Sequence, residues 1–155
     1  MNDTVARNME TFRRLQEDVI VGGRDDLVEQ ILAPTFRPLR VGLEDLHRLT
    51  AASAQRPDSP DPYSQFRMGL RANQAALSNQ QRVINEICAV GDRVWARRRI
   101  EATHSGWFLG RRATGRQVSW TEAGMVRFDR DGRIVEGWFQ ADELNLAHQL
   151  GLTLR

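Results

Sequence analysis

A histidine and an aspartate in the last third of the chain have the residue types for proton transfer. His104 and Asp142 fall on the predicted inward faces of two long strands, and a glycine-rich bend and three tryptophans lie between them. A histidine and a carboxylate inside an apolar cup can transfer protons without a metal or a cofactor. The sequence therefore predicts an acid/base site for a small molecule, with Asp142 and His104 as catalytic residues.

The alternation of side chains along a strand decides which residues share a face with this pair. The strand that ends at His104 also places Arg98 on that face, and the strand that leads to Asp142 places Trp138 and Gln140 beside it. A single bulge would reverse either assignment. We predict that the substrate pocket is lined by Trp107, Trp120, Trp138, Gln140, Arg98 and Phe66.

Helical periodicity occupies the first half of the chain, and strand alternation occupies most of the second half. Predicted helices cover residues 4–21, 25–32, 63–77 and 143–150, and predicted strands cover residues 81–90, 94–109, 117–129 and 133–141. A short extended segment is expected over 36–41. Residues 42–54 are consistent with a helix and 56–62 form a proline-rich loop, so we interpret 42–62 as a loop insertion within one domain over 1–155.

Helices followed by a run of long antiparallel strands are typical of an α+β domain. A strongly curved sheet with helices across its open side makes a cone. The floor of that cone is where we expect a small molecule to bind.

The composition argues against several other partners. The net charge is +2, all 22 basic residues are arginines, and acids interrupt the arginine clusters, so no nucleic-acid partner is expected. The single cysteine, Cys88, excludes an internal disulfide and is predicted to be buried. The three histidines lack metal-ligand spacing, so no metal site is expected. No apolar run is long enough for a membrane span and no secretion signal is recognisable, which favours a cytoplasmic location.

Two stretches resemble the central signature of the SnoaL-like polyketide cyclases. The first runs Thr103-His104-Ser105-Gly106-Trp107-Phe108-Leu109-Gly110 and continues with Ala113-Thr114-Gly115-Arg116; the second runs Asp131-Gly132-Arg133-Ile134-Val135-Glu136 and continues with Trp138, Asp142 and Gln149-Leu150-Gly151. That family has the nuclear-transport-factor-2-like fold. The resemblance implies a cone-shaped α+β barrel, in which N-terminal helices pack over the open face of a curved antiparallel sheet.

The resemblance also implies a function. Typical members close a ring of an aromatic polyketide by intramolecular aldol condensation, with an aspartate as acid/base and no cofactor. By resemblance this chain is a cofactor-independent cyclase that acts on a polyketide-like small molecule in secondary-metabolite biosynthesis, for example of an antibiotic. Asp142 matches the aspartate, and His104 matches a pocket histidine that would donate a hydrogen bond to the developing oxyanion. A homodimer or higher homo-oligomer is also common for this fold.

Other interpretations stay open on the residues alone. Asp142 is also consistent with a cap of the last helix, His104 with a structural strand residue, and the tryptophans with core packing. A second function is an epoxide hydrolase or epoxide-opening cyclase built from Arg99, Glu101 and Asp142, or a cofactor-free hydroxylase on the same fold. A third is a non-catalytic ligand-binding or dimerisation module. Glu101 inside the cavity would favour epoxide opening.

Overall fold

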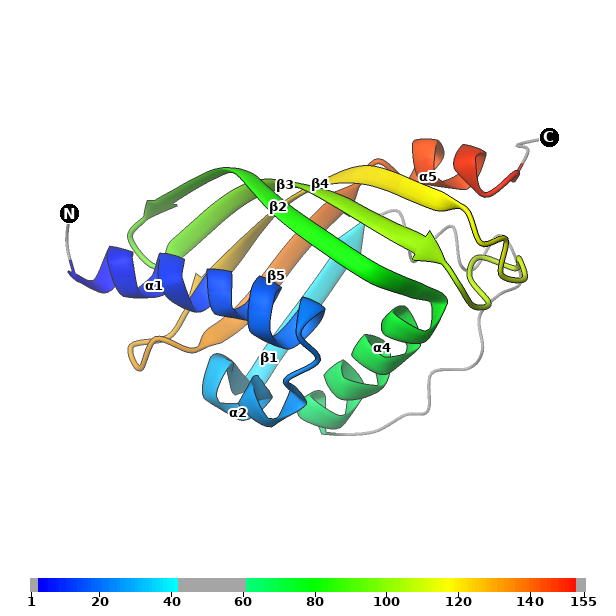
Figure 1. Cartoon of the computed structure of the whole chain (residues 1–155). Helices are drawn as coiled ribbons and strands as arrows, with labels where there is room; N and C mark the ends of the chain where they lie inside the picture. Colours follow the sequence, from blue (N-terminus) through cyan, green and yellow to red (C-terminus); the bar gives the residue numbers. More distant parts are fainter. Residues whose placement is uncertain (1–2, 42–60, 153–155) are drawn as a thin grey trace.

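A curved five-stranded sheet carries helices α1, α2 and α4 on one of its two faces (Figure 1). The computed structural model describes residues 3–41 and 61–152. In chain order the elements are α1 (Asp3–Arg14), η1 (Leu15–Val21), η2 (Asp25–Leu27), α2 (Val28–Ile31), β1 (Leu32–Val41), α4 (Pro62–Ala76), β2 (Leu77–Val90), β3 (Arg93–His104), β4 (Gln117–Phe128), β5 (Ile134–Ala141) and α5 (Glu143–Gln149). The predicted α+β class is confirmed. None of the described helices is long and apolar enough to span a membrane.

The strand order is β1-β5-β4-β3-β2, so the sheet is open and β1 and β2 form its edges. Strands β2 to β5 pair antiparallel, whereas β1 pairs parallel with β5. The predicted antiparallel sheet corresponds to β2–β5, and the parallel edge strand β1 extends it. β1 reaches its partner only through a long connection that includes α4 and the β2–β4 meander, and a connection of that length permits parallel pairing.

The predicted elements lie close to the observed ones. The predicted helix over 4–21 is α1 continued by η1, and the one over 25–32 is η2 with α2. The predicted helices over 63–77 and 143–150 are α4 and α5, and the four predicted long strands are β2–β5. β3 ends at His104, earlier than predicted, because the chain bends there and the N–H groups of Ser105 and Gly106 donate to the Ala76 carbonyl at 2.9 and 3.1 Å. The helix predicted over 42–54 lies outside the described residues.

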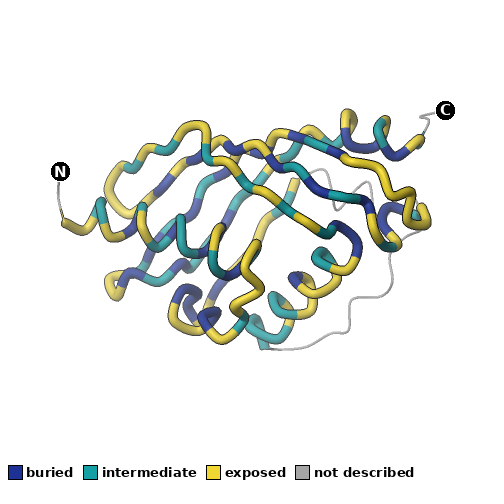
Figure 2. Tube along the Cα trace, viewed as in Figure 1, coloured by how far each residue is buried: buried dark blue, intermediate teal, exposed yellow. Residues whose placement is uncertain are grey.

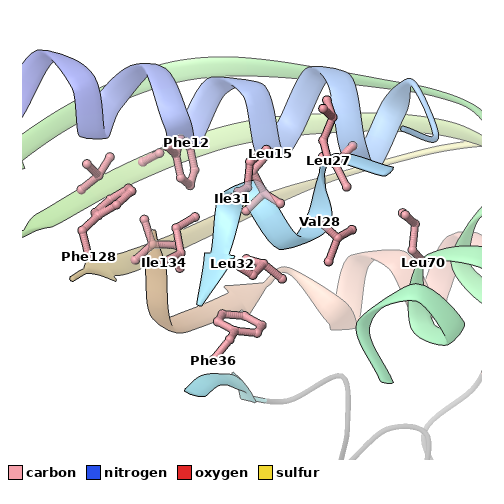
Figure 3. Packing of buried hydrophobic residues seen from close by; sticks show 14 residues of the cluster. Phe12, Leu15, Leu27, Val28, Ile31, Leu32, Phe36, Leu70, Phe128 and Ile134 are labelled. Carbon is pink, nitrogen blue, oxygen red and sulfur yellow. The ribbon is translucent and has the colours of Figure 1, made fainter. Parts of the chain in front are cut away.

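The main core lies between the helices and the inner face of the sheet. Buried apolar side chains of α1, η1 and α2 meet those of β1, β4 and β5, and Figure 3 shows Phe12 pointing from α1 toward Ile134 and Phe128. A second cluster, which includes Ile100, Trp120 and Leu146, fills the end of the sheet nearest to α5. Burial alternates strictly along β3, so every second residue faces the helices (Figure 2).

The outer face of the sheet is largely open to solvent. Cys88, predicted to be buried, is exposed there because it lies on the edge strand β2 opposite Trp95, which is itself 44% exposed. The prediction of burial rested on the apolar neighbours of Cys88. Ile84 and Ile87, however, point to the other face and pack against the main core.

Two glycines leave the space that one aromatic ring occupies on the inner face. A Cβ atom added to Gly124 or Gly137 would fall onto the Phe139 ring, which lies across both residues. The ring is thereby held close to the sheet, with the Arg98 guanidinium 4.9 Å from its centroid. The glycines thus fix the position of a buried charge.

We expect Gly124→Ala to lower the free energy of unfolding by about 1–3 kcal/mol, because the added methyl group must displace the Phe139 ring. Urea denaturation measures the change. Gly69→Ala is the matched control: nothing lies within 4 Å of its Cβ position on helix α4, so this change should be neutral or stabilising. Equal effects of the two substitutions would contradict the packing described here.

Candidate functional site

A bulge near the start of β5 sets the facing of all residues that follow it. Phe128 pairs with Ile134, whereas the preceding residue Arg127 pairs with Glu136. Val135 is therefore an extra residue on β5, and each later side chain points to the face opposite the one that simple alternation predicts.

The predicted inward facing of Trp138 and Gln140 is therefore wrong. Phe139 points toward the helices instead, where it contacts the Arg98 guanidinium. Trp138 lies on the outer face, with its ring centroid 6.5 Å from that of Trp95, and Gln140 is exposed. A sequence contains little signal for such a bulge, because Asp131-Gly132 predicts the turn but not the pairing that follows it.

The other predicted pocket residues are divided between the interior and the surface. Trp120 is buried on the inner face and packs in the second core cluster. Phe66, on α4, makes an edge-to-face contact with Phe36 of β1, with centroids 6.2 Å apart. Trp107 is 61% exposed in the turn after β3. Only Trp120, Phe66 and Arg98 therefore lie under the helices.

His104 ends β3 with its imidazole completely buried. Its Nδ1 lies 2.9 Å from the Thr114 hydroxyl, and its backbone bonds to Gly115 and Arg116 close the glycine-rich loop over the strand end. Burial lowers the pKa of His104, although a hydrogen bond with the Gly106 backbone opposes that effect. The ring is therefore biased toward its neutral form. Its Nε2 is buried and has no hydrogen-bond partner among the described residues.

Asp142 lies just beyond β5 with an exposed side chain. Its carboxylate accepts a hydrogen bond from the Asn145 N–H at 3.3 Å and so caps the N-terminus of α5. Its own N–H donates to the Thr121 carbonyl. The residue before it, Ala141, is the register partner of Glu122. Asp142 therefore stands at the rim of the sheet, next to a buried carboxylate that the sequence did not single out.

The structure does not bring His104 and Asp142 together. Thr121, which holds the Asp142 backbone, pairs with Arg99 of β3. Arg99 is five residues from His104, which is about 17 Å along a strand. The two predicted catalytic residues therefore stand at different places on the sheet, and one is buried while the other is exposed.

The described interior instead contains a charged cluster on the inner face, which we call the arginine cluster. It consists of Arg40 on β1, Arg82 on β2, Arg98 on β3 and Glu122 on β4. Arg98 and Glu122 are each 1% exposed and form an ion pair, and Arg40 reaches the second oxygen of Glu122 at 2.5 Å. Sequence alternation placed Arg98 on this face correctly. The signal for Glu122 was its position between Trp120 and Gly124 on the same face.

The surrounding charges set the ionisation of this cluster. Burial alone would raise the pKa of Glu122, but the charges of Arg98, Arg40 and Arg82 and the hydrogen bond from Arg98 outweigh that effect and lower it to about 2. Burial lowers the pKa of Arg82 to about 10; the charge of Glu122 opposes this shift, and the charges of Arg98 and Arg40 add to it. Glu122 and Arg82 therefore stay charged near neutral pH.

Several donors in and beside this cluster have no acceptor among the described residues. They are Nε and Nη1 of Arg98, Nε of Arg40 and Nε2 of Gln16. A buried donor that lacks an acceptor costs about 1–3 kcal/mol, so native structures seldom leave several of them together. The arrangement therefore offers several N–H donors to an acceptor-rich group.

Two shallow depressions lie on the opposite, outer face. They measure about 210 and 180 Å³ and share Arg99 and Ser119 in their linings, with Glu101 beside the first. Arg99 and Glu101 form an exposed ion pair at 2.9 Å. Both depressions are smaller than the usual pocket for an organic ligand. The acid–arginine set considered for epoxide opening thus has two of its members on the outer face.

The described part of the chain holds no group of three or more histidine, cysteine, aspartate or glutamate side chains placed to bind a metal ion. The cluster residues are arginines and one glutamate that is already paired with two of them. These side chains suit an anion better than a cation.

Comparison with known proteins shows which protein family this chain is related to. The sequence model described as SnoaL-like polyketide cyclase matches residues 42–150. No curated protein matches the chain. A proposed SnoaL-like polyketide cyclase from Jannaschia sp. CCS1 superposes with a TM-score of 0.79 at 16% identity, over 99% of this chain and 98% of that one.

Two proteins of the genus Streptomyces are similarly alike in structure. IdmH from Streptomyces antibioticus, a proposed polyketide cyclase, has a TM-score of 0.72 at 27% identity over 94% of this chain and 99% of its own. AclR from Streptomyces galilaeus, a proposed hydroxylase, has a TM-score of 0.73 at 21% identity over 95% of this chain and 97% of its own. The family match covers more than half of the chain, and the fold agrees with it. The chain belongs to the SnoaL-like polyketide cyclase family.

Proposed function

We propose that this protein is a cofactor-independent cyclase that closes a ring in a polyketide-like small molecule by aldol-type acid/base chemistry in secondary-metabolite biosynthesis. The observation that carries the proposal is the buried arginine cluster on an otherwise apolar inner face. An aldol ring closure passes through an enolate, and fixed positive charge in a water-poor site stabilises such an anion. Family membership supports the same class of reaction.

Proton transfer needs a base that is free to accept a proton. Glu122 is a weak base because the arginines hold its pKa at about 2. Asp142, the residue that the family resemblance gives as acid/base, stands at the rim one residue past the partner of Glu122. We therefore propose Asp142 as the proton acceptor for a substrate that reaches from the rim to the arginine cluster.

His104 is the second catalytic residue that we propose from the resemblance. Its Nε2 is buried and has no partner within the described part of the chain, as expected of a group that donates a hydrogen bond to substrate. About 20 Å of strand separate it from Arg98, so it would contact a different part of an extended substrate.

We also propose that the protein is a homodimer that uses the outer face of the sheet. One row of side chains crosses all five strands in direct register: Leu39, Trp138, Met125, Trp95 and Cys88. The row is apolar and partly exposed, with Leu39 at 55% and Trp95 at 44%. An exposed apolar row of this kind can face its own copy across a two-fold axis, which favours a second copy as its partner.

The activity test uses a panel of linear poly-β-keto methyl esters of increasing length, analysed by liquid chromatography and mass spectrometry. We expect the protein to accelerate formation of a cyclic product with the mass of the substrate, or with the mass less one water. Addition of one oxygen atom would instead indicate a hydroxylase. Hydration of an epoxide in a parallel assay, without any ring closure, would indicate epoxide opening and contradict the cyclase.

Two substitutions at Asp142 separate catalysis from helix capping. Asp142→Asn keeps a good cap but removes the base, so it should fold normally and lose about 10²–10⁴-fold in turnover. Asp142→Ala should lose the same turnover and also about 1 kcal/mol of stability. Asp92→Asn, which changes an exposed acid in the β2–β3 turn, should leave both quantities unchanged. Wild-type turnover in Asp142→Asn would restrict Asp142 to its capping role.

The dimer is tested by size-exclusion chromatography with light scattering. We expect a dimer for the wild type and a monomer for Trp95→Arg, because the charge would interrupt the apolar row. Trp107→Arg is the control, since this tryptophan is 61% exposed in a turn away from the row. A monomeric wild type at high micromolar concentration, or an unchanged dimer in Trp95→Arg, would refute the proposed interface.

A further inference from the structure

We propose that Arg98, Arg40 and Gln16 form a binding subsite for an anionic oxygen of the substrate, either the carboxylate of a free acid or the enolate of a β-dicarbonyl group. Both groups present oxygen acceptors and no donor, and both carry a negative charge. The inference deepens the proposed function by naming the substrate class, and it rests on that function only for the reaction that follows binding.

The first argument is the charge of the cluster. Three guanidinium groups, those of Arg40, Arg82 and Arg98, share the carboxylate of Glu122. Arg82 interacts with Glu122 only through its charge, since its hydrogen bonds among the described residues go to Gln80 and Gln16. Among the described residues, three guanidinium groups therefore face one carboxylate, and of the three Arg40 is partly exposed to solvent. Buried charge is ordinarily paired, so a complementary anion is the missing member.

The second argument is the set of unpaired donors. Arg98 donates to Glu122 only through Nη2, and its Nε and Nη1 have no acceptor in residues 3–41 and 61–152 although the side chain is 1% exposed. Gln16 is likewise 1% exposed; its Oε1 accepts from Arg82, but its Nε2 has no acceptor among the described residues. With Nε of Arg40 the unpaired groups are all N–H donors. Such a set is satisfied by a group with several lone pairs and no hydrogens of its own.

The third argument is the shape of the surroundings. The Arg98 guanidinium lies between two aromatic rings, 5.5 Å from the centroid of Phe12 and 4.9 Å from that of Phe139. The two rings give the guanidinium an apolar surrounding, and its unpaired Nε and Nη1 donors point in different directions, so each can donate to a separate acceptor oxygen. A flat conjugated substrate matches the apolar walls.

Access to the subsite runs along Arg40. Its side chain is 37% exposed at one end and bonds to the buried Glu122 at the other, so it connects the cluster with solvent. Arg40 lies on the edge strand β1, next to Phe139 of β5 in register. An anionic group that enters past Arg40 would exchange water for guanidinium donors.

The test measures binding to the whole protein by isothermal titration calorimetry with three probes of similar size. They are 2-naphthoate, its neutral counterpart 2-naphthamide, and benzoylacetone, whose enolate is populated at moderately alkaline pH. We expect at least one of the two anions to bind about tenfold or more tightly than the amide, since hydrogen bonds to a charged partner are the stronger ones. Preference for naphthoate would assign the subsite to a carboxylate, and preference for the diketone at alkaline pH would assign it to an enolate.

Matched variants locate the binding. Arg40→Gln should weaken binding of the preferred anion about tenfold and leave the affinity for naphthamide unchanged. Arg40→Lys should restore part of the lost affinity. Arg37→Gln is the control, because Arg37 has the same charge on the same strand but pairs with Glu136 of the outer face. Arg98→Met should abolish the preference if it folds. If Arg98→Met does not fold, Arg40→Gln still tests the proposal.

Equal affinity for the anions and the amide, or an anion preference that survives Arg40→Gln and falls in Arg37→Gln, would overturn the subsite. No saturable binding of either anion would overturn it as well. These results are independent of turnover. If the protein prefers anions but does not close rings, the proposed cyclase activity is wrong and the subsite stands. If it closes rings but shows no anion preference, the subsite is wrong and the cyclase activity stands.

Discussion

The ion pair between Arg98 and Glu122 constrains the structure more than any other described interaction. It joins adjacent residues of β3 and β4 on the inner face, where both side chains are 1% exposed. Charges at such a depth are tolerated only when partners compensate the loss of water. Phe12 and Phe139 cover the guanidinium, Gly124 and Gly137 make room for Phe139, and Arg40 occupies the remaining carboxylate oxygen. A domain that needed only stability would do as well with apolar residues here, so we associate the pair with function.

The division of the sheet into two faces follows from this arrangement. The inner face carries the charge and the helices, whereas the outer face carries Trp95, Trp138 and the exposed Cys88. Asp142 stands at the boundary, where β5 ends and α5 begins. Gln149 of that helix bonds both the N–H and the carbonyl of Ser119, and so substitutes for a strand beyond the end of β5. The rim is thereby ordered beside the cluster.

Much of this fold was predictable from the sequence, because alternation along β3 and β4 and the periodicity of α1 and α4 are local properties. The face of Arg98 followed from the same alternation. The facing of Trp138 and Gln140 did not, since one extra residue at Val135 depends on how β5 pairs with β4. The exposure of Cys88 and the parallel pairing of β1 depend on strand order in the same way. The role of Glu122 needed the structure, because three of its neighbours come from other strands.

The most direct test of this account is a pH titration of the Glu122 carboxylate, followed by carbon-13 NMR in the folded protein and assigned with Glu122→Gln. The account predicts a pKa of about 2, so the side chain stays ionised well below the ordinary glutamate range. Because the folded-state pKa is the lower one, the pair stabilises the protein above the ordinary glutamate pKa, and this stability is lost as the pH falls toward 2. A pKa at or above the ordinary 4.5 would show that the arginines do not hold this carboxylate, and it would contradict the account.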